Sequence, residues 1–116
     1  MGKMTRFKYG VANERGTALT KAGTYTITEQ DILNDGVSFF KINGAYTLTL
    51  PVVNSKLKGI SLLIFGNDAA SKVYVSGGFG GGGNNYDTVT IGVDNAVEFW
   101  CDGTYWYALG VTVAGS

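Results

Sequence analysis

The sequence predicts an all-β fold: an antiparallel β-sandwich or jelly roll of about eight short strands, with an extended N-terminal arm. Three observations support this class. Glycine occurs 18 times and proline once, beside abundant Thr, Val and Tyr, a composition typical of strands joined by tight turns. Short runs of alternating apolar and polar residues recur roughly every eight to twelve positions. No stretch has the apolar periodicity of an amphipathic helix.

Charge divides the 116-residue chain into a basic arm, residues 1–22, and an acidic β-domain, residues 23–116. The arm has five basic side chains against one carboxylate, a net charge of +4; the domain has four lysines against eight carboxylates, a net charge of −4. Opposite potentials steer association, so we expect the arm to order on an acidic partner surface, with a solvated tail as the alternative. Nucleic acid is a poor partner because the acidic domain repels phosphate. The arm residues expected to bind the partner are Lys3, Arg6, Phe7, Lys8, Tyr9, Arg15 and Lys21.

The first predicted elements are a strand in the arm over residues 6–11, a strand over 23–28 and one helical turn within 28–35. Thr28 is the expected N-cap of that turn, with Asp31 three residues later. A hairpin is predicted next, with strands 36–42 and 45–50 joined at Asn43-Gly44. Its register places Val37, Phe39, Tyr46, Leu48 and Leu50 on the core face, and Ser38, Phe40, Ile42, Thr47 and Thr49 on the opposite face.

Four more strands are predicted outside the last hairpin. Residues 59–66 (GISLLIFG) are apolar on both faces, which predicts a central strand covered on both sides. Residues 70–77 and 86–92 alternate and flank a glycine-rich loop. Residues 111–114 are expected to form a short edge strand.

The strongest turn signal is Asp102-Gly103, which predicts a two-residue hairpin loop within residues 97–110. In that register Phe99 faces Trp106 on the core side, packed beside Leu48 and Leu62. The core side also holds Val97, Cys101, Thr104 and Ala108. The other side carries Glu98, Trp100, Tyr105, Tyr107 and Leu109.

The residue inventory argues against an enzyme and predicts no cofactor. The chain has no histidine, which removes the usual general base and the commonest metal ligand. Its single cysteine, Cys101, cannot form an internal disulfide and is expected to be a buried, inert thiol. A calcium site built from Asp94 and Asn95 with loop carbonyls is a weaker alternative, because calcium takes six to eight oxygens, and we predict no metal. No apolar run approaches a membrane span or a secretory signal.

The glycine-rich stretch SGGFGGGGNN, residues 76–85, has two open interpretations. Gly78, Gly80 and Gly83 match a dinucleotide-binding pattern, but a strand follows in place of the required helix, so we reject that match. The loop is then either a flexible surface segment or a place of close backbone contact with a partner. The contact residues under the second interpretation are Gly77, Gly78, Phe79, Gly80, Asn84 and Asn85.

Two stretches carry a resemblance: AYTLTLP (residues 45–51), followed by Gly59 opening an apolar strand, and VEFWCDGTYW (residues 97–106). Together they resemble small β-domains of tailed-bacteriophage virion proteins, namely capsid decoration (cement) proteins, head fibres and tail-fibre modules. The matching positions, within residues 36–107, are Thr49-Leu50-Pro51, Gly59, Asp102-Gly103 and Trp106. The resemblance implies a homotrimer bound to a capsid or a tail.

We therefore expect a non-enzymatic virion protein, a capsid decoration protein that bridges capsomers on the outer capsid surface. Its partners would be further copies of itself and the major capsid protein. The alternative is a receptor- or carbohydrate-binding module of a tail or head fibre, which would use exposed aromatics and the glycine-rich loop on a host-surface glycan. The expected subunit interface consists of Trp100, Tyr105, Tyr107, Phe40 and Ile42.

Overall fold

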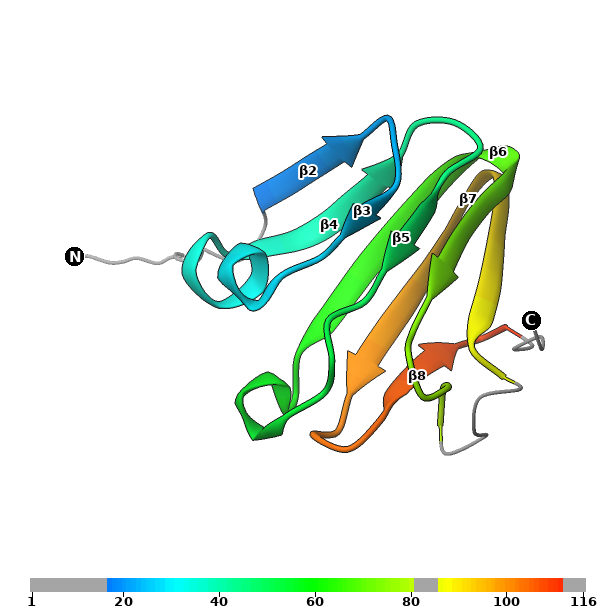
Figure 1. Cartoon of the computed structure of the whole chain (residues 1–116). Helices are drawn as coiled ribbons and strands as arrows, with labels where there is room; N and C mark the ends of the chain where they lie inside the picture. Colours follow the sequence, from blue (N-terminus) through cyan, green and yellow to red (C-terminus); the bar gives the residue numbers. More distant parts are fainter. Residues whose placement is uncertain (1–16, 81–85, 112–116) are drawn as a thin grey trace.

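The computed structural model describes residues 17–80 and 86–111, which form one seven-stranded sheet curled into a half-barrel (Figure 1). The two longest strands, β6 (Ser61–Tyr74) and β7 (Thr88–Cys101), run through the whole curl. The shorter strands are β2 (Thr17–Lys21), β3 (Tyr25–Thr26), β4 (Val37–Ile42), β5 (Thr47–Thr49) and β8 (Trp106–Leu109).

Most of the sheet is parallel. β4 pairs with the first half of β6, from Phe39 opposite Leu63 to Ile42 opposite Gly66, and β5 pairs with the last three residues of β6. β2 extends the sheet beyond β4 and β3 extends it beyond β5, both in parallel. Among the described strands, only β7, against β6, and β8, against β7, are antiparallel. The predicted antiparallel sandwich or jelly roll is therefore wrong.

The curl divides the sheet into two halves. The first half-sheet contains β2, β4, residues 61–66 of β6, residues 95–101 of β7 and β8. The second half-sheet contains β3, β5, residues 72–74 of β6 and residues 88–91 of β7. The chain passes from the first half to the second three times: from β2 to β3, from β4 to β5, and within the single strand β6. β7 then runs back from the second half to the first.

The predicted hairpin at Asn43-Gly44 is a corner between these halves, and β4 and β5 do not pair. A type I′ turn needs positive φ at both central residues, here Asn43 and Gly44. Gly44 has φ +121°, but Asn43 does not have a positive φ, because Asp94 is the one non-glycine residue in the described ranges that does. The Gly44 N–H donates to Oδ1 of Asn67 at 2.7 Å, and Asn67 Nδ2 donates to Oδ1 of Asn43 at 2.7 Å. These bonds attach the corner to β6, so β5 continues alongside β6 instead of folding back on β4.

β6 turns at the same level through residues 67–71, where its register against β7 shifts. The buried Ser71 hydroxyl donates to the Gly44 carbonyl at 2.8 Å and accepts from the Asp68 N–H at 3.2 Å. Residues 59–66 and 70–77, predicted as separate strands, thus belong largely to one bent strand. Residues 86–92 and the strand leading to Cys101 are joined likewise in β7, which bends at Gly92 (φ +92°) and Asp94 (φ +51°).

Two connections return the chain for the next parallel pass, and each contains one helical turn. Gln30–Asn34 form a π-helical turn and Ser55–Leu57 a 3-10 turn. The predicted turn within residues 28–35 is confirmed: the Asp31 N–H donates to Thr28 Oγ1, and the Thr28 N–H donates to Asp31 Oδ2, both at 3.1 Å. Tyr25 also donates to Asp31 at 2.5 Å, which together with burial raises the pKa of Tyr25 to about 12.

The core fills the inside of the curl. Trp106, Phe99, Leu48 and Leu62 each have 0 % of their surface exposed and Val97 has 2 %, so the predicted core around Phe99 and Trp106 is confirmed. The Trp106 indole N–H donates to the Pro51 carbonyl at 3.0 Å, which satisfies the one polar atom of this side chain.

Thr17–Lys21, which the sequence assigned to the arm, form β2 within the sheet. The strand predicted for residues 6–11 lies outside the described residues. The edge strand predicted for 111–114 also falls almost wholly outside them, since only Val111 is described, in a bend.

Gly66→Ala is expected to lower the free energy of unfolding by about 1–3 kcal/mol, because the new methyl group overpacks the corner of β6. A Cβ there would lie 2.6 Å from Ser71 Cβ and 3.0 Å from Ile91 Cβ. Gly23→Ala is the matched control, since no atom lies within 4 Å of its added Cβ. Urea denaturation measures both variants, and equal stability would contradict the corner packing.

Candidate interaction surface

The outward side of the first half-sheet is an exposed apolar surface, which we call the apolar face. Strand pairing aligns its side chains in rows: Phe39, Leu63, Glu98 and Leu109 lie side by side across four strands. A second row places Trp100 between Ser61 and Tyr107. The apolar face consists of Phe39, Lys41, Ser61, Leu63, Phe65, Ala96, Glu98, Trp100, Tyr107 and Leu109.

Large side chains on this face remain in contact with solvent. Leu63 is 40 % exposed, Trp100 39 % and Leu109 46 %, whereas their strand neighbours Ile64 and Phe99 are fully buried on the inward side. The Trp100 and Tyr107 rings lie against each other at 6.0 Å between centroids. A contiguous group of this kind on a paired sheet is typical of an association surface, whereas single exposed apolar residues are ordinary.

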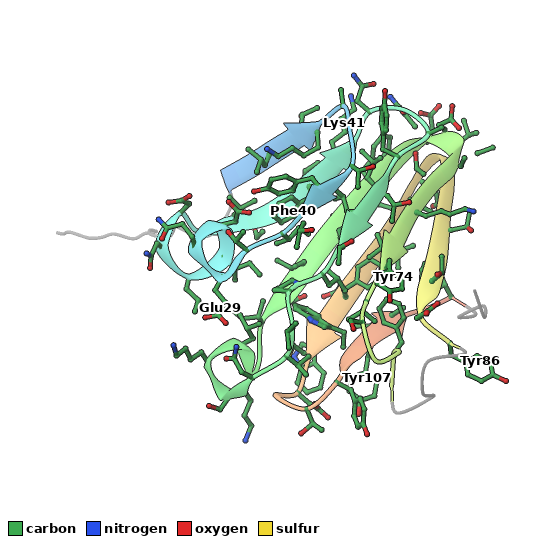
Figure 2. The ribbon with its side chains drawn as sticks, in the orientation of Figure 1. Glu29, Phe40, Lys41, Tyr74, Tyr86 and Tyr107 are labelled. Carbon is green, nitrogen blue, oxygen red and sulfur yellow. The ribbon has the colours of Figure 1, made fainter. Side chains whose placement is uncertain are left out.

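The two charges on the apolar face each have a neighbour on the same face. Ser61 Oγ donates to Glu98 Oε2 at 2.6 Å, and Lys41 Nζ lies 5.9 Å from the centroid of the Phe65 ring. Figure 2 labels Lys41 on β4 and Tyr107 on β8, at the two sides of this half-sheet. Neither contact neutralises its charge, so a partner that covers the face has to supply opposite charges to Lys41 and Glu98.

Asp102 shapes the hairpin turn at the end of this face. Its Oδ1 accepts the N–H groups of Thr104 at 2.7 Å and Tyr105 at 2.8 Å, and its Oδ2 accepts the Tyr107 hydroxyl at 2.9 Å. These hydrogen bonds lower the pKa of Asp102, and those from the backbone N–H groups contribute more than the one from Tyr107. The bond to the carboxylate raises the pKa of Tyr107. The carboxylate thereby fixes the edge of the apolar face.

The predicted hairpin register is wrong, but the predicted sides are right. Cys101 pairs with Trp106 and Phe99 with Ala108, because the loop contains four residues, closed by the Asp102 N–H bond to the Tyr105 carbonyl. Pairing is displaced by two residues, and an even displacement leaves the paired side chains of both strands on their predicted faces. Thr104, predicted on the core side, is instead exposed in the loop. Trp100 and Tyr107 therefore point outward as expected, and Tyr105, 39 % exposed, lies beside the turn.

Phe40 and Ile42, predicted at the subunit interface, are instead fully buried in the core. Thr17 pairs with Val37 but the next residue, Ala18, pairs with Phe39, so Ser38 is an extra residue of β4 with no partner on β2. This bulge reverses the alternation along β4: Val37 points inward before it, and Phe40 points inward after it. Phe39, predicted in the core, lies on the apolar face, as do Leu63 and Phe65, which the sequence placed in a doubly covered strand. In the structure, β6 alternates between fully buried residues and residues in contact with solvent. Its uniformly apolar sequence gives no sign of this alternation.

The glycine-rich loop is attached to the domain where it is described. Phe79 is 3 % exposed and lies 5.7 Å from the Phe99 ring, and the Gly80 N–H donates to the Trp106 carbonyl at 2.8 Å. Gly77 and Gly78 have φ +92° and +91° and line a hollow of about 120 Å³ beside Tyr105. Asn84 and Asn85 lie outside the described residues. Gly78 is buried and Phe79 belongs to the core, which leaves Gly77, Gly80 and Tyr105 as the exposed part of the expected contact.

Most of the predicted arm residues lie outside the described residues: Lys3, Arg6, Phe7, Lys8, Tyr9 and Arg15. Lys21 does not belong with them, because it ends β2 and its Nζ lies 3.8 Å from the centroid of the Tyr25 ring. A cation–π contact of this kind attaches Lys21 to the domain.

Two further features of the described residues bear on reactive groups: the single cysteine and the clustering of metal-binding side chains. Cys101 is buried, as expected, and burial raises the pKa of its thiol. No cluster of three or more acidic, histidine or cysteine side chains that could hold a metal occurs in residues 17–80 and 86–111. Neither helical turn within these ranges is long and apolar enough to cross a membrane.

The positions that carry the phage resemblance meet at one point of the fold. The Trp106 indole bonds to Pro51, and the Gly59 N–H donates to the Cys101 carbonyl at 2.7 Å, next to Asp102-Gly103. These residues join the hairpin to the loop before β6, so the positions that carry the resemblance have a structural role in this fold. No family model, no curated protein and no solved structure matches this chain.

Tyr107→Phe is expected to raise the pKa of Asp102, because the hydroxyl that donates to the carboxylate is lost. The pKa should stay below its ordinary range, since the N–H groups of Thr104 and Tyr105 still donate. Carboxyl NMR titration measures this value. Tyr105→Phe is the control, because it keeps the backbone donor, and an equal change in both variants would contradict the assignment.

Proposed function

We propose that this chain is a non-enzymatic structural protein of a tailed-bacteriophage virion, a decoration protein on the outer capsid surface. The observation that carries the proposal is the apolar face, a row of exposed large side chains on a paired and hydrogen-bonded sheet. Copies of the chain associate through this face as a homotrimer, which in turn binds the major capsid protein. Each capsid contact then adds to the free energy needed to separate neighbouring capsomers.

The apolar face has the composition that favours association. Aromatic anchors such as Trp100 and Tyr107 contribute a large contact area at a small cost in side-chain entropy. Lys41 and Glu98 lie on the same face in opposite strands of the half-sheet, so contact between two copies can place unlike charges together. The resemblance at Pro51, Gly59 and Trp106 supports the class of protein, and the apolar face supports the mode of action.

The location of the chain on the particle tests this proposal. Cryo-electron microscopy of purified particles should show the chain over the capsid surface, at positions where capsomers meet. Density at a tail or fibre tip would instead support the alternative, a receptor- or carbohydrate-binding module. Absence of the chain from purified particles by mass spectrometry would refute both.

Trp100→Ala is expected to weaken self-association by about 2 kcal/mol or more, because it removes an aromatic anchor from the apolar face. Sedimentation equilibrium measures the association constant, and thermal unfolding shows whether the variant stays folded. Val93→Ala is the control, since Val93 is 61 % exposed at the bend of β7, away from this face. A monomeric wild-type chain, or unchanged association of the Trp100 variant, would contradict the assembly.

A further inference from the structure

The outward side of the second half-sheet has a different chemistry from the apolar face. One row across its four strands consists of Thr26, Thr49, Tyr74 and Thr88, and the next consists of Thr47, Lys72 and Thr90. Figure 2 labels Tyr74 near the end of β6, within this half. We call these seven side chains the hydroxyl face; Thr26, Lys72 and Thr90 are exposed and the other four are half-buried.

Most of these polar groups are available to a ligand. Within the described part of the chain, the side chains of Thr26, Thr47, Thr49 and Thr90 make no hydrogen bond. The Lys72 amine and the Tyr74 hydroxyl likewise make none there. The exception is Thr88, whose hydroxyl donates to Asp87 Oδ1 at 3.0 Å and retains acceptor capacity.

The arrangement is ordered before any ligand arrives. Adjacent strands are about 4.8 Å apart and alternate residues along a strand about 6.8 Å apart, so the hydroxyls form a regular grid. Threonine is stiff at χ1, and binding to it costs little side-chain entropy. The grid surrounds one aromatic ring, Tyr74, and one positive charge, Lys72.

This chemistry selects among classes of partner. A protein partner needs an apolar centre, which the hydroxyl face lacks. Nucleic acid binds mainly by neutralisation of its closely spaced phosphates, whereas a sugar chain binds mainly through its hydroxyls, and this face has six hydroxyls and a single lysine. A polysaccharide supplies what fits: hydroxyls that donate and accept, C–H faces that stack on an aromatic ring, and carboxylates for the lysine.

We propose that the hydroxyl face binds an extended polysaccharide containing uronic acid. The sugar chain runs across the strands along the Thr26–Thr88 row, one ring stacks on Tyr74, and a carboxylate pairs with Lys72. The inference does not depend on the proposed capsid function, because it concerns the opposite half of the sheet.

Affinity electrophoresis of the full chain in gels containing alginate, a linear polyuronate, tests the proposal, with the neutral polysaccharide dextran as comparison. Alginate should retard the protein more than dextran does, and Tyr74→Ala should weaken the alginate interaction about tenfold or more. Lys72→Gln should reduce retardation by alginate and leave that by dextran unchanged. Equal retardation by the two polymers would overturn the role of the carboxylate.

Thr49→Val removes one hydroxyl while keeping shape and β propensity, so it tests the grid without loss of folding. Thr20→Val is the matched control, because Thr20 is exposed on β2 in the first half-sheet. Thr49→Val should weaken alginate binding while Thr20→Val leaves it unchanged. Absence of alginate binding, or equal loss in the Thr49 and Thr20 variants, would overturn the proposal.

Discussion

Hydrogen bonds between stacked corners determine this fold. The Asn67 side chain accepts from the backbone of Gly44 and donates to Asn43, while Ser71 donates to the Gly44 carbonyl from the other side. Together they attach the turn after β4 to the bend of β6. Without this attachment Asn43-Gly44 would be free to close a local hairpin, β5 would lie against β4, and neither half-sheet would exist in its present form.

The corners also explain why one small sheet has two different outer surfaces. In each pass of the chain, the residues before the corner belong to one half-sheet and the residues after it belong to the other. Phenylalanine, leucine and tryptophan gather outside the first half, and threonine gathers outside the second. Both halves contribute their inward side to one core, so each outer face rests on the same rigid support.

Sequence reasoning recovered what alternation determines and missed what long-range pairing determines. The two sides of the last hairpin, the burial of Phe99 and Trp106 and the Thr28–Asp31 turn all follow from residues close in the chain. Parallel and antiparallel strands have the same period of two, so alternation could not reveal that Leu48 pairs with Val73 and not with a residue of β4. The extra residue Ser38 reversed the inward side of β4, and a single residue of this kind leaves no clear mark in the sequence. Hence Trp100 and Tyr107 were placed correctly, and Phe40 and Ile42 were not.

The course of β6 through both halves has a consequence for how the chain folds during its synthesis. Within residues 17–80 and 86–111, β2 pairs only with β4, and β3 only with β5, whereas β6 pairs with both β4 and β5. The strands made first therefore have no common template until residues 61–74 are available. The partners in these parallel pairs lie more than twenty residues apart for most positions, and such loops must close before any pairing is gained. Because β6 joins the β2–β4 pair to the β3–β5 pair, the parallel strands can form one sheet only after the ribosome has released β6, the last of them to be made.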